Sequence, residues 1–391
     1  MAEGTNEGPK ERNAGRGGRP TTRRLRWLVP VLAAIVTLAG FGTYYYVETS
    51  SSQCVGGAHT LVVQTYASFL DSGSDPASAR AAVFGGFENA THSRVCVEYV
   101  SGDLATNLLT SGGARPDLVV GLDELTAPRV DAAGLLVPYA PPELAQMPAG
   151  LVANLAPDHS VVPYEYGFLG LDYNVSYDAA HGKPLSTGNY LTAIAGNRSL
   201  ASQFLYELPT TDITGEEFLA MEVAFSDEVL HENWTTFWRA IGPVAPSTTD
   251  WGTGFAEFSA GTYASFVSYT TDPAYGAYFG PVGALNTSVL RYGGENYSWE
   301  SIYGVGIVRG GVHNLTLAEQ FEDWLLSGPA QSDLPTNEWE YPANATTELP
   351  GAFNWSVPPT SIVPLNSFES VNATAADLPG WILQWQSAVG G

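Results

Sequence analysis

An uncharged apolar stretch at residues 28–47 constrains this 391-residue chain more than any other feature of its sequence. Twenty apolar residues in an α-helix are long enough to cross the hydrocarbon core of a bilayer. Seven basic residues lie before the stretch, and three tyrosines lie at its far end. Because basic residues stay in the cytoplasm and aromatic residues gather at the interface, this order predicts a cytoplasmic tail at 1–26, a transmembrane signal anchor at 27–47 and an extracellular remainder.

Two other fates of this segment stay open. A secretory signal peptide would be cleaved, but its apolar core would be shorter and would end in a small-x-small cleavage site. A lipid anchor at Cys54 is disfavoured, because residues 51–53 are Ser-Ser-Gln and do not form a lipoprotein signal. We therefore expect a single-pass protein of the cell membrane, with a linker at 48–57 and an external domain at 58–391.

The charge balance inverts after the apolar stretch. Residues 48–391 contain nine basic and 37 acidic residues, a net charge of about −28, and Lys183 is the only lysine among them. A surface of this sign repels polyanions, so we exclude nucleic acid as a partner. The acidity suits a salty and an acidic habitat equally.

Ten Asn-x-Ser/Thr sequences, the acceptor pattern for N-linked glycans, all lie beyond the apolar stretch. Because such acceptors belong to surface loops of exported proteins, their one-sided placement predicts an external glycoprotein. The acceptors are Asn89, Asn174, Asn197, Asn233, Asn286, Asn296, Asn314, Asn344, Asn354 and Asn372.

Both cysteines of the chain, Cys54 and Cys96, lie on the predicted external side. Disulfides form and persist in oxidising compartments, so we expect these two residues to pair. Two free buried thiols are the alternative. The bond would tie the linker to the globular part.

Short apolar runs alternate with helical patterns in the external domain. Residues 61–64 and 118–122 are typical of strands buried on both faces, whereas 77–89 and 318–326 have apolar residues at helical spacing. Trp381 and Trp385 lie one helical turn apart near the C-terminus. This alternation predicts α/β lobes with largely parallel sheets.

Polar clusters follow three of the apolar runs. Tyr66 comes after the first run, Asp123 after the second, and Glu165 lies between two tyrosines after residues 161–163. Ligands of open α/β sheets bind beyond the carboxyl ends of the strands. The shared position of these clusters therefore predicts a binding site.

The segment SYTTDPAY at 268–275 suits the wall of a site for a flat, cationic ligand. It is expected on a short turn after a strand at 263–267. Tyr269 and Tyr275 offer negative ring faces worth roughly 0.5–2 kcal/mol each to a stacked cation, and Asp272 offers a fixed charge. The alternative is a buried, tyrosine-rich strand end with a capped Asp-Pro turn.

Seven segments in the same order resemble the thiamine-binding proteins of ABC importers. SYTTDPAY and LPTNEWEYP at 334–342 are the specific ones. The others are TYASF at 65–69, PDLVVGLDE at 116–124, VPYEYGF at 162–168, TDWGTGFAEF at 249–258 and WILQWQSAV at 381–389. The resemblance covers nearly all of residues 60–390.

The resemblance implies an α/β, two-lobed type II periplasmic-binding-protein fold, here with an N-terminal transmembrane helix, that delivers thiamine or its phosphate esters to a permease. The aromatic contacts it implies are Tyr66, Trp251, Tyr269, Tyr275 and Trp339. Because thiamine has a cationic thiazolium ring, acidic partners are expected at Asp123, Glu165 and Asp272. Asp123 could instead cap the helix that follows it, and Glu165 could only bond the neighbouring tyrosines.

One segment departs from the family pattern. A loop that holds the phosphate of phosphorylated ligands through a serine matches PTTDITG at 209–215, where Asp212 takes the serine position. A carboxylate there repels phosphate, so we expect free thiamine to bind in preference to its mono- or diphosphate. Glu338 and Glu340, on either side of Trp339, are expected at the solvated surface.

Two other classes of function stay open. Thiamine-degrading enzymes resemble the same fold, but their cysteine nucleophile has no counterpart in Cys54 or Cys96. The six histidines are scattered, and the chain has no HExxH, CxxC, GxSxG or P-loop sequence. An envelope glycoprotein that binds another cationic aromatic ligand is the remaining alternative.

We expect a non-enzymatic, membrane-anchored extracellular receptor for thiamine that functions as a monomer with an ABC permease and ATPase. Thiamine is its cargo, and no cofactor or metal is expected. Residues 58–167 and about 271–391 should form one lobe, and about 168–270 the other.

Overall fold

The computed structural model describes residues 54–70, 75–100, 102–111, 115–368 and 370–390. The predicted cytoplasmic tail and membrane span lie outside the described residues. Within the described part of the chain, no helix combines the length and the apolar character that a membrane span requires.

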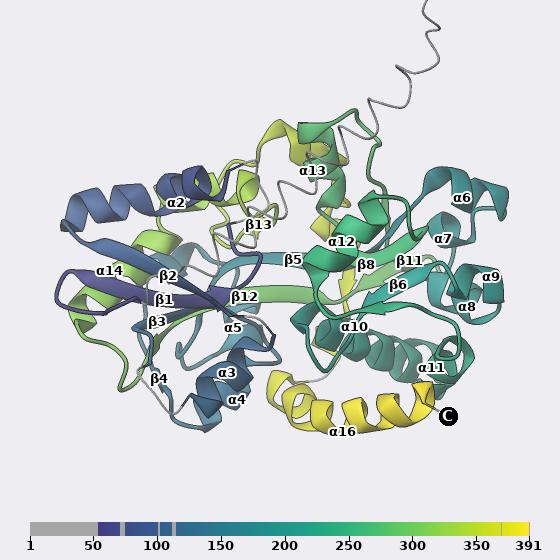
Figure 1. Cartoon of the computed structure of the whole chain (residues 1–391), viewed down its shortest axis with the longest axis horizontal. Helices are drawn as coiled ribbons and strands as arrows, with labels where there is room; N and C mark the ends of the chain where they lie inside the picture. Colours follow the sequence, from purple (N-terminus) through teal and green to yellow (C-terminus); the bar gives the residue numbers. More distant parts are fainter. Residues whose placement is uncertain (1–53, 71–74, 101, 112–114, 369, 391) are drawn as a thin grey trace, which may run out of the picture. The chain divides into compact units, whose positions relative to one another are not determined.

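A mixed sheet of eleven strands organises the described residues (Figure 1). Its main path runs β2-β1-β3-β12-β5-β8-β6-β7. The strands on this path are β1 (Thr60–Tyr66), β2 (Arg94–Val100), β3 (Leu118–Leu122), β5 (Val162–Tyr173), β6 (Phe204–Glu207), β7 (Ser247–Thr248), β8 (Ser265–Tyr269) and β12 (Glu300–Val308).

The prediction of largely parallel sheets needs a correction at the centre of this path. β1 pairs in parallel with β2 and β3, and β6 pairs in parallel with β7 and β8. However, β12 is antiparallel to β3 and β5, and β5 is antiparallel to β8. The two outer groups are therefore joined through two strands that run against their neighbours.

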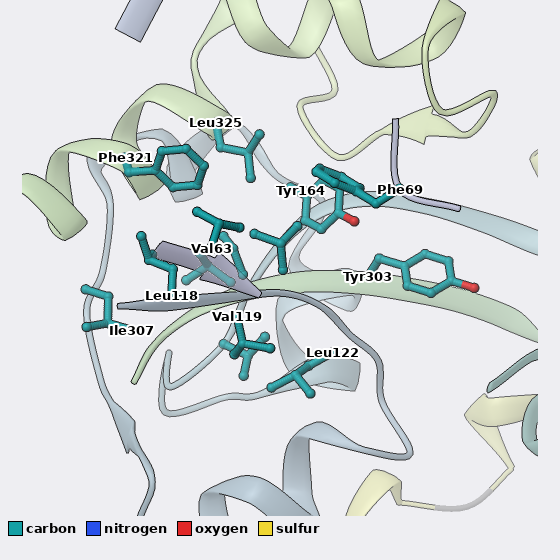
Figure 2. Packing of buried hydrophobic residues seen from close by; sticks show 14 of the residues in the cluster. Val63, Phe69, Leu118, Val119, Leu122, Tyr164, Tyr303, Ile307, Phe321 and Leu325 are labelled. Atoms are coloured by element: carbon teal, nitrogen blue, oxygen red, sulfur yellow. The ribbon is translucent and has the colours of Figure 1, made fainter. Parts of the chain in front are cut away.

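Two hydrophobic cores lie along the sheet, and β5 contributes to both. Tyr164 belongs to the first core, whereas Leu169 and Leu171 belong to the second. In the first core, β1, β3 and β12 pack against α2 (Pro76–Thr91) and α14 (Leu315–Leu326). Figure 2 shows Phe321 and Leu325 of α14 on one side of the strands and Val119 and Leu122 on the other.

Aromatic side chains fill the second core. The indole of Trp238, on α11 (Thr235–Ile241), lies 5.1 Å from the ring of Tyr206, 5.7 Å from Phe218 and 6.1 Å from Trp385. Phe218 lies on α10 (Ile213–Ala224), and Trp385 lies on the C-terminal helix α16 (Val371–Val389). The predicted lobe boundaries stay a prediction, and this packing favours assigning α16 to the lobe around the second core.

Several helices begin where the sequence supplies a side-chain cap. Asp75 accepts the Ala77 amide before α2, and Asn314 accepts the Leu317 amide before α14. Such caps satisfy amides that have no partner inside the helix. The helix expected at 77–89 and the one expected at 318–326 are therefore both present and extend slightly further.

The remaining elements are short. The helices are α3 (Leu104–Thr110), α4 (Ala127–Ala132), α5 (Ala149–Leu155), α6 (Val175–Ala180), α7 (Pro184–Thr187), α8 (Tyr190–Ala195), α9 (Arg198–Ala201), α12 (Trp251–Ser259), α13 (Asp272–Phe279) and α15 (Gly328–Asp333). A π-helix, η2 (Phe225–Leu230), extends α10, and the 3-10 turns are η1 (Pro142–Gln146), η3 (Leu334–Thr336), η4 (Gly351–Trp355), η5 (Pro359–Ser361) and η6 (Leu365–Ser367). The short strands are β4 (Leu136–Val137), β9 (Thr287–Ser288), β10 (Leu290–Tyr292), β11 (Glu295–Ser298), β13 (Tyr341–Pro342) and β14 (Val363–Pro364).

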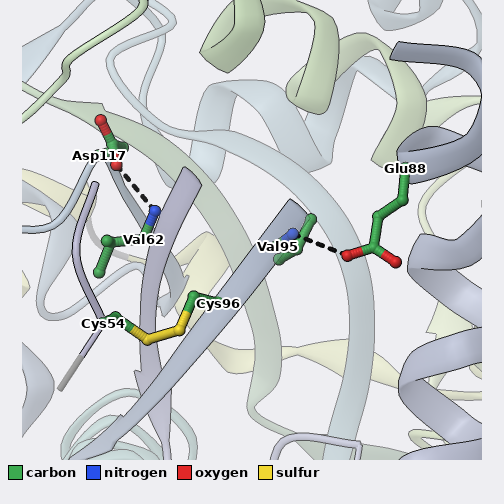
Figure 3. The surroundings of a disulfide bond; sticks show 6 residues. All are labelled: Cys54, Val62, Glu88, Val95, Cys96 and Asp117. Atoms are coloured by element: carbon green, nitrogen blue, oxygen red, sulfur yellow. Dashed lines mark hydrogen bonds between the residues drawn. A yellow bond between two sulfur atoms is a disulfide. The ribbon is translucent and has the colours of Figure 1, made fainter. Parts of the chain in front are cut away.

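A disulfide joins Cys54 to Cys96 on the edge strand β2 (Figure 3). The Cα atoms of the two residues are 5.8 Å apart. Nearby, Asp117 accepts the Val62 amide at 2.8 Å, and Glu88 accepts the Val95 amide at 2.8 Å. The start of the described chain is thus fixed to the sheet by a covalent bond.

One glycan acceptor, Asn344, is enclosed by the fold. Asn344 is buried, and its Nδ2 donates to Gln146 Oε1 at 2.8 Å and to the Leu326 carbonyl at 3.4 Å. A glycan cannot be attached to an amide that is enclosed in this way without opening the fold. The expectation of a glycan at Asn344 therefore does not suit the folded chain.

Candidate functional site

The predicted aromatic contacts form one connected group of rings. The rings of Trp251 and Tyr269 are 6.4 Å apart, and those of Tyr275 and Trp339 are 5.3 Å apart and perpendicular. Tyr269 and Trp339 are buried, while Tyr66, Trp251 and Tyr275 are half-buried. These residues come from β1, β8, α12, α13 and the loop before β13, so the fold gathers distant segments here.

Two aromatic residues that the sequence analysis missed connect these pairs. Phe255 stacks on Trp251 at 4.9 Å and lies 5.8 Å from Tyr275. Tyr303 lies 5.9 Å from the ring of Tyr66, and its hydroxyl is 2.6 Å from that of Tyr269. Phe255 is one helical turn after Trp251, which is a signal that could have found it. Tyr303 lies within β12, where no pattern distinguishes it from a core residue.

The segment 268–275 forms a strand end and a helix start, not the expected short turn. Ser268 and Tyr269 complete β8, and α13 begins at Asp272 because proline at 273 suits the first turn of a helix. Asp272 Oδ2 accepts the Tyr269 amide at 3.3 Å and the Ser268 hydroxyl. The indole Nε1 of Trp251 in turn donates to Ser268 Oγ at 2.9 Å. Asp272 is therefore linked to Trp251 through one hydroxyl.

Tyr66 connects two glutamates at the end of β1. Its hydroxyl lies 3.0 Å from Glu338 Oε2 and 3.3 Å from Glu165 Oε1. Its ring lies over Gly121, which has a φ of 98°, and a Cβ there would come within 2.3 Å of the ring. Glycine is needed at 121 for both reasons.

The expectation that Glu338 and Glu340 are solvated is wrong for Glu340, which is buried, whereas Glu338 is half-buried. Glu338 accepts the Leu70 amide and bonds Tyr66, and Glu340 is buried with Oε2 at 3.3 Å from the Thr271 hydroxyl. Between them, Trp339 has a φ of 64°, and a left-handed backbone is unusual at a tryptophan.

Burial makes the negative charge of these acids costly. Desolvation raises the pKa of Glu165 to about 8 and that of Asp272 to about 6. Among the described residues, neither carboxyl has an ion-pair partner, and Glu165 Oε2 has no hydrogen-bond partner. The site therefore carries acidic groups whose charge would be stabilised by a cation from outside the chain.

Asp123 and Asp212 both accept backbone amides. Asp123 Oδ1 accepts the amides of Leu125 at 3.1 Å and Thr126 at 2.7 Å in the turn before α4, whose N-cap is Thr126, so Asp123 holds this turn and is not the cap of the helix. Asp212 Oδ1 accepts the Thr214 amide at 2.9 Å at the start of α10, and its Oδ2 accepts the Trp251 amide at 3.3 Å at the start of α12. Desolvation raises the pKa of each to about 6.

Two surface hollows lie elsewhere. One, of about 580 Å³, is lined by residues that include Asn189, Leu230 and Tyr292. The other, of about 620 Å³, is lined by residues that include His231 and Arg239. Neither hollow is lined by a residue that was predicted to contact the ligand. The candidate site therefore consists of the aromatic group and its acids.

The raised pKa of Glu165 gives a test of its burial. The folded pKa of about 8 lies above the value of about 4.3 for an unfolded glutamate. The folded chain therefore holds an extra proton between these values, and this contribution to stability is lost as pH rises through 8. We expect E165Q, which cannot ionise, to lose less stability than wild type between pH 5 and pH 8 in urea unfolding. E295Q, a change at an exposed glutamate, should show the same dependence of stability on pH as wild type. If E165Q also shows the wild-type dependence, the raised pKa of Glu165 is wrong.

Comparison with known proteins gives relatives over most of the chain. No family model matches it. It is 26% identical over 335 residues to the thiamine-binding periplasmic protein of Salmonella typhimurium and 25% identical over 336 residues to that of Escherichia coli. Each match covers 84% of this chain and 93% of the relative. These relatives are binding proteins, which confirms the expectation of a non-enzymatic protein.

Solved structures show the same fold. A periplasmic thiamin binding protein superposes with a TM-score of 0.71 at 21% identity, covering 86% of this chain and 99% of that one. The fructose-6-phosphate-bound protein AfuA of Actinobacillus pleuropneumoniae superposes with a TM-score of 0.67 at 14% identity, covering 85% and 98%. The α/β periplasmic-binding-protein fold is thereby confirmed for the described residues.

Proposed function

We propose that this chain captures thiamine outside the membrane and delivers it to a permease. Its fold and its homologues, which are those of substrate-binding proteins of ABC importers, support this proposal. The observation that carries the proposal is the connected aromatic group beside Glu165 and Asp272, which form no salt bridge within the described part of the chain. Aromatic faces and uncompensated carboxyls are what a flat cation requires.

The aromatic residues would hold the rings of the vitamin. Stacking on Trp251, Tyr269 and Tyr275 supplies contact area that does not depend on hydrogen bonds. Tyr66 and Trp339 complete the group. Glu165 and Asp272 would supply the negative charge, and a bound cation would lower their pKa values towards the ordinary range.

Capture requires the two cores to move apart and close again. Tyr66 packs against the first core and Tyr269 belongs to the second, so a ligand between them touches both. β5 and β12 connect the cores, and the register between these two strands shifts at Tyr303 and Gly304. We propose that bending occurs at this irregularity, since hinges form where a few residues absorb the change in backbone angles.

Asp212 favours the unphosphorylated vitamin. Amides at a helix N-terminus are a common phosphate site, but here the Asp212 carboxylate already accepts amides from the starts of α10 and α12. Asp250 and the buried Glu207 lie close enough to act electrostatically on Asp212. A phosphate at this place would meet negative charge, and the amides of Thr214 and Trp251 already have a partner.

Calorimetric titration of the full chain with thiamine and its mono- and diphosphate tests this specificity. We expect one-to-one binding of thiamine and at least tenfold weaker binding of both esters. D212N keeps a capping oxygen but loses the negative charge. It should therefore reduce the difference in affinity between thiamine and its phosphate esters. Asp75, an exposed cap at the start of α2, gives the matched control D75N. No binding of thiamine by folded protein would refute the function, whereas equal binding of the esters would refute only the role of Asp212.

Substitution of Tyr275 tests the aromatic group. Y275L should weaken thiamine binding by roughly 2- to 30-fold, which corresponds to the loss of about 0.5–2 kcal/mol of cation–π attraction. Y275F should retain most of the affinity, because the ring face remains. Y292L, at an exposed tyrosine of β10, is the control. An unchanged affinity in Y275L would remove this residue from the site.

Residues 27–47 would keep the receptor at the membrane next to its permease. After alkaline carbonate extraction of membranes, we expect the full chain to stay in the pellet and a chain that begins at residue 48 to enter the supernatant. Release of the full chain would favour a cleaved signal peptide.

A further inference from the structure

Three buried carboxyls face one another at a place that the proposed function leaves unexplained. Asp123, Glu124 and Glu217 each offer an oxygen within 4.8 Å of the others. All three side chains are at most 1% exposed. Like charges at this distance repel strongly in a buried environment, so something must compensate them.

The three residues come from two parts of the fold. Asp123 and Glu124 follow β3, which belongs to the first core, and Glu217 lies on α10, whose buried residues belong to the second. The carboxyls therefore meet between the cores. Whatever compensates their charge also favours the approach of α10 to the end of β3.

Each carboxyl is held in place by a donor from the chain. Glu124 Oε2 accepts the Ile302 amide at 3.0 Å, and its Oε1 accepts the indole N–H of Trp299. Asp123 Oδ1 accepts the Thr126 amide, and Glu217 Oε2 accepts the Ser301 hydroxyl at 2.7 Å. Metal-binding carboxylates are commonly oriented by such outer hydrogen bonds.

Two oxygens of the cluster have no such donor. Asp123 Oδ2 and Glu217 Oε1 are buried without a hydrogen-bond partner among the described residues. Among the described residues, Arg129 pairs with Asp103 and Glu216, and no salt bridge joins a basic residue to the cluster. An unpaired buried oxygen costs free energy unless a proton, a donor or a cation satisfies it.

We propose that Asp123, Glu124 and Glu217 bind a hard divalent cation of the Ca²⁺ class between the two cores. Carboxylate oxygens are the ligands such ions prefer, and water would fill the remaining positions. Asp123 is then a ligand of the cation, through the oxygen that accepts no amide, and not a contact of the vitamin. Burial and mutual repulsion raise the pKa of Glu124 and Glu217, so cation binding should weaken as pH falls and the carboxyls keep their protons.

Terbium luminescence tests the site in the full chain without thiamine. Tb³⁺ resembles Ca²⁺ in size and in its preference for oxygen, and an excited indole close to it sensitises its emission. Trp299 touches Glu124 and would act as the sensitiser. With excess Mg²⁺ to occupy surface acids, we expect saturable one-to-one emission that Ca²⁺ displaces. E217Q should weaken the affinity at least tenfold.

Glu222 provides a matched control on the same helix. It is buried, accepts the Trp238 indole N–H at 2.9 Å and accepts the Ser226 hydroxyl at 2.9 Å, so both of its oxygens have partners. E222Q should bind Tb³⁺ as wild type does. If wild type, E217Q and E222Q give the same signal, or folded wild type gives no saturable signal, the three carboxyls share protons and the proposal is wrong.

A second variant and a second measurement keep the test valid if E217Q misfolds. If circular dichroism shows that E217Q does not fold, D123N takes its place, because asparagine keeps an oxygen that can accept the amides of Leu125 and Thr126. Ca²⁺ should raise the Tm of wild type and E222Q but not that of the cluster variant. An equal rise in all three would overturn the proposal, whatever the result with thiamine.

Discussion

The scarcity of basic side chains governs much of this structure. With nine basic residues against 37 acidic ones after residue 47, the fold cannot pair its buried carboxyls internally. Arg129 bonds two acids, and His313 pairs with Asp117. The other buried acids rely on amides, hydroxyls, protons or an external cation. Each unpaired carboxyl is therefore a place where a cation gains more free energy than it would at a balanced surface.

The long strands β5 and β12 position residues of the candidate site. Because β5 contributes to both cores and β12 pairs with it from Glu300 to Val305, residues near the centre of this pair lie between the two cores. Glu165 and Tyr303 face each other in the register of β5 and β12, next to the shift at Gly304. A cation that binds there would act on both cores at once, which is how a ligand can favour a closed arrangement.

The sequence predicts local structure well and non-local pairing poorly. Residues 118–122 form a strand as expected, because an apolar run bounded by turn-forming residues has few alternatives. The antiparallel centre of the sheet was missed, since the direction of β12 depends on a connection of more than a hundred residues from β5. SYTTDPAY was expected on one turn, but Pro273 and the hydrogen bonds of Asp272 start a helix there.

The aromatic and the acidic members of the candidate site differ in how well the sequence predicts them. The aromatic members lie in recognisable segments, and the fold connects all five of them through Phe255 and Tyr303. The sequence does not distinguish the acids of the site from other acids, because an acidic chain offers too many candidates. Glu338 and Glu340 differ from surface glutamates through contacts with Tyr66, Leu70 and Thr271, which are distant in the sequence.

The two cations that we propose do not compete for the same charge. A divalent ion among Asp123, Glu124 and Glu217 would leave one negative charge there, and Glu165 and Asp272 would remain for the vitamin. Tyr269 bonds Tyr303 and Thr214 through its hydroxyl at 2.6 and 3.0 Å, and its ring lies 6.4 Å from that of Trp251. Neutralising the cluster would let the cores approach, and the aromatic group could then close on its ligand without forcing like charges together.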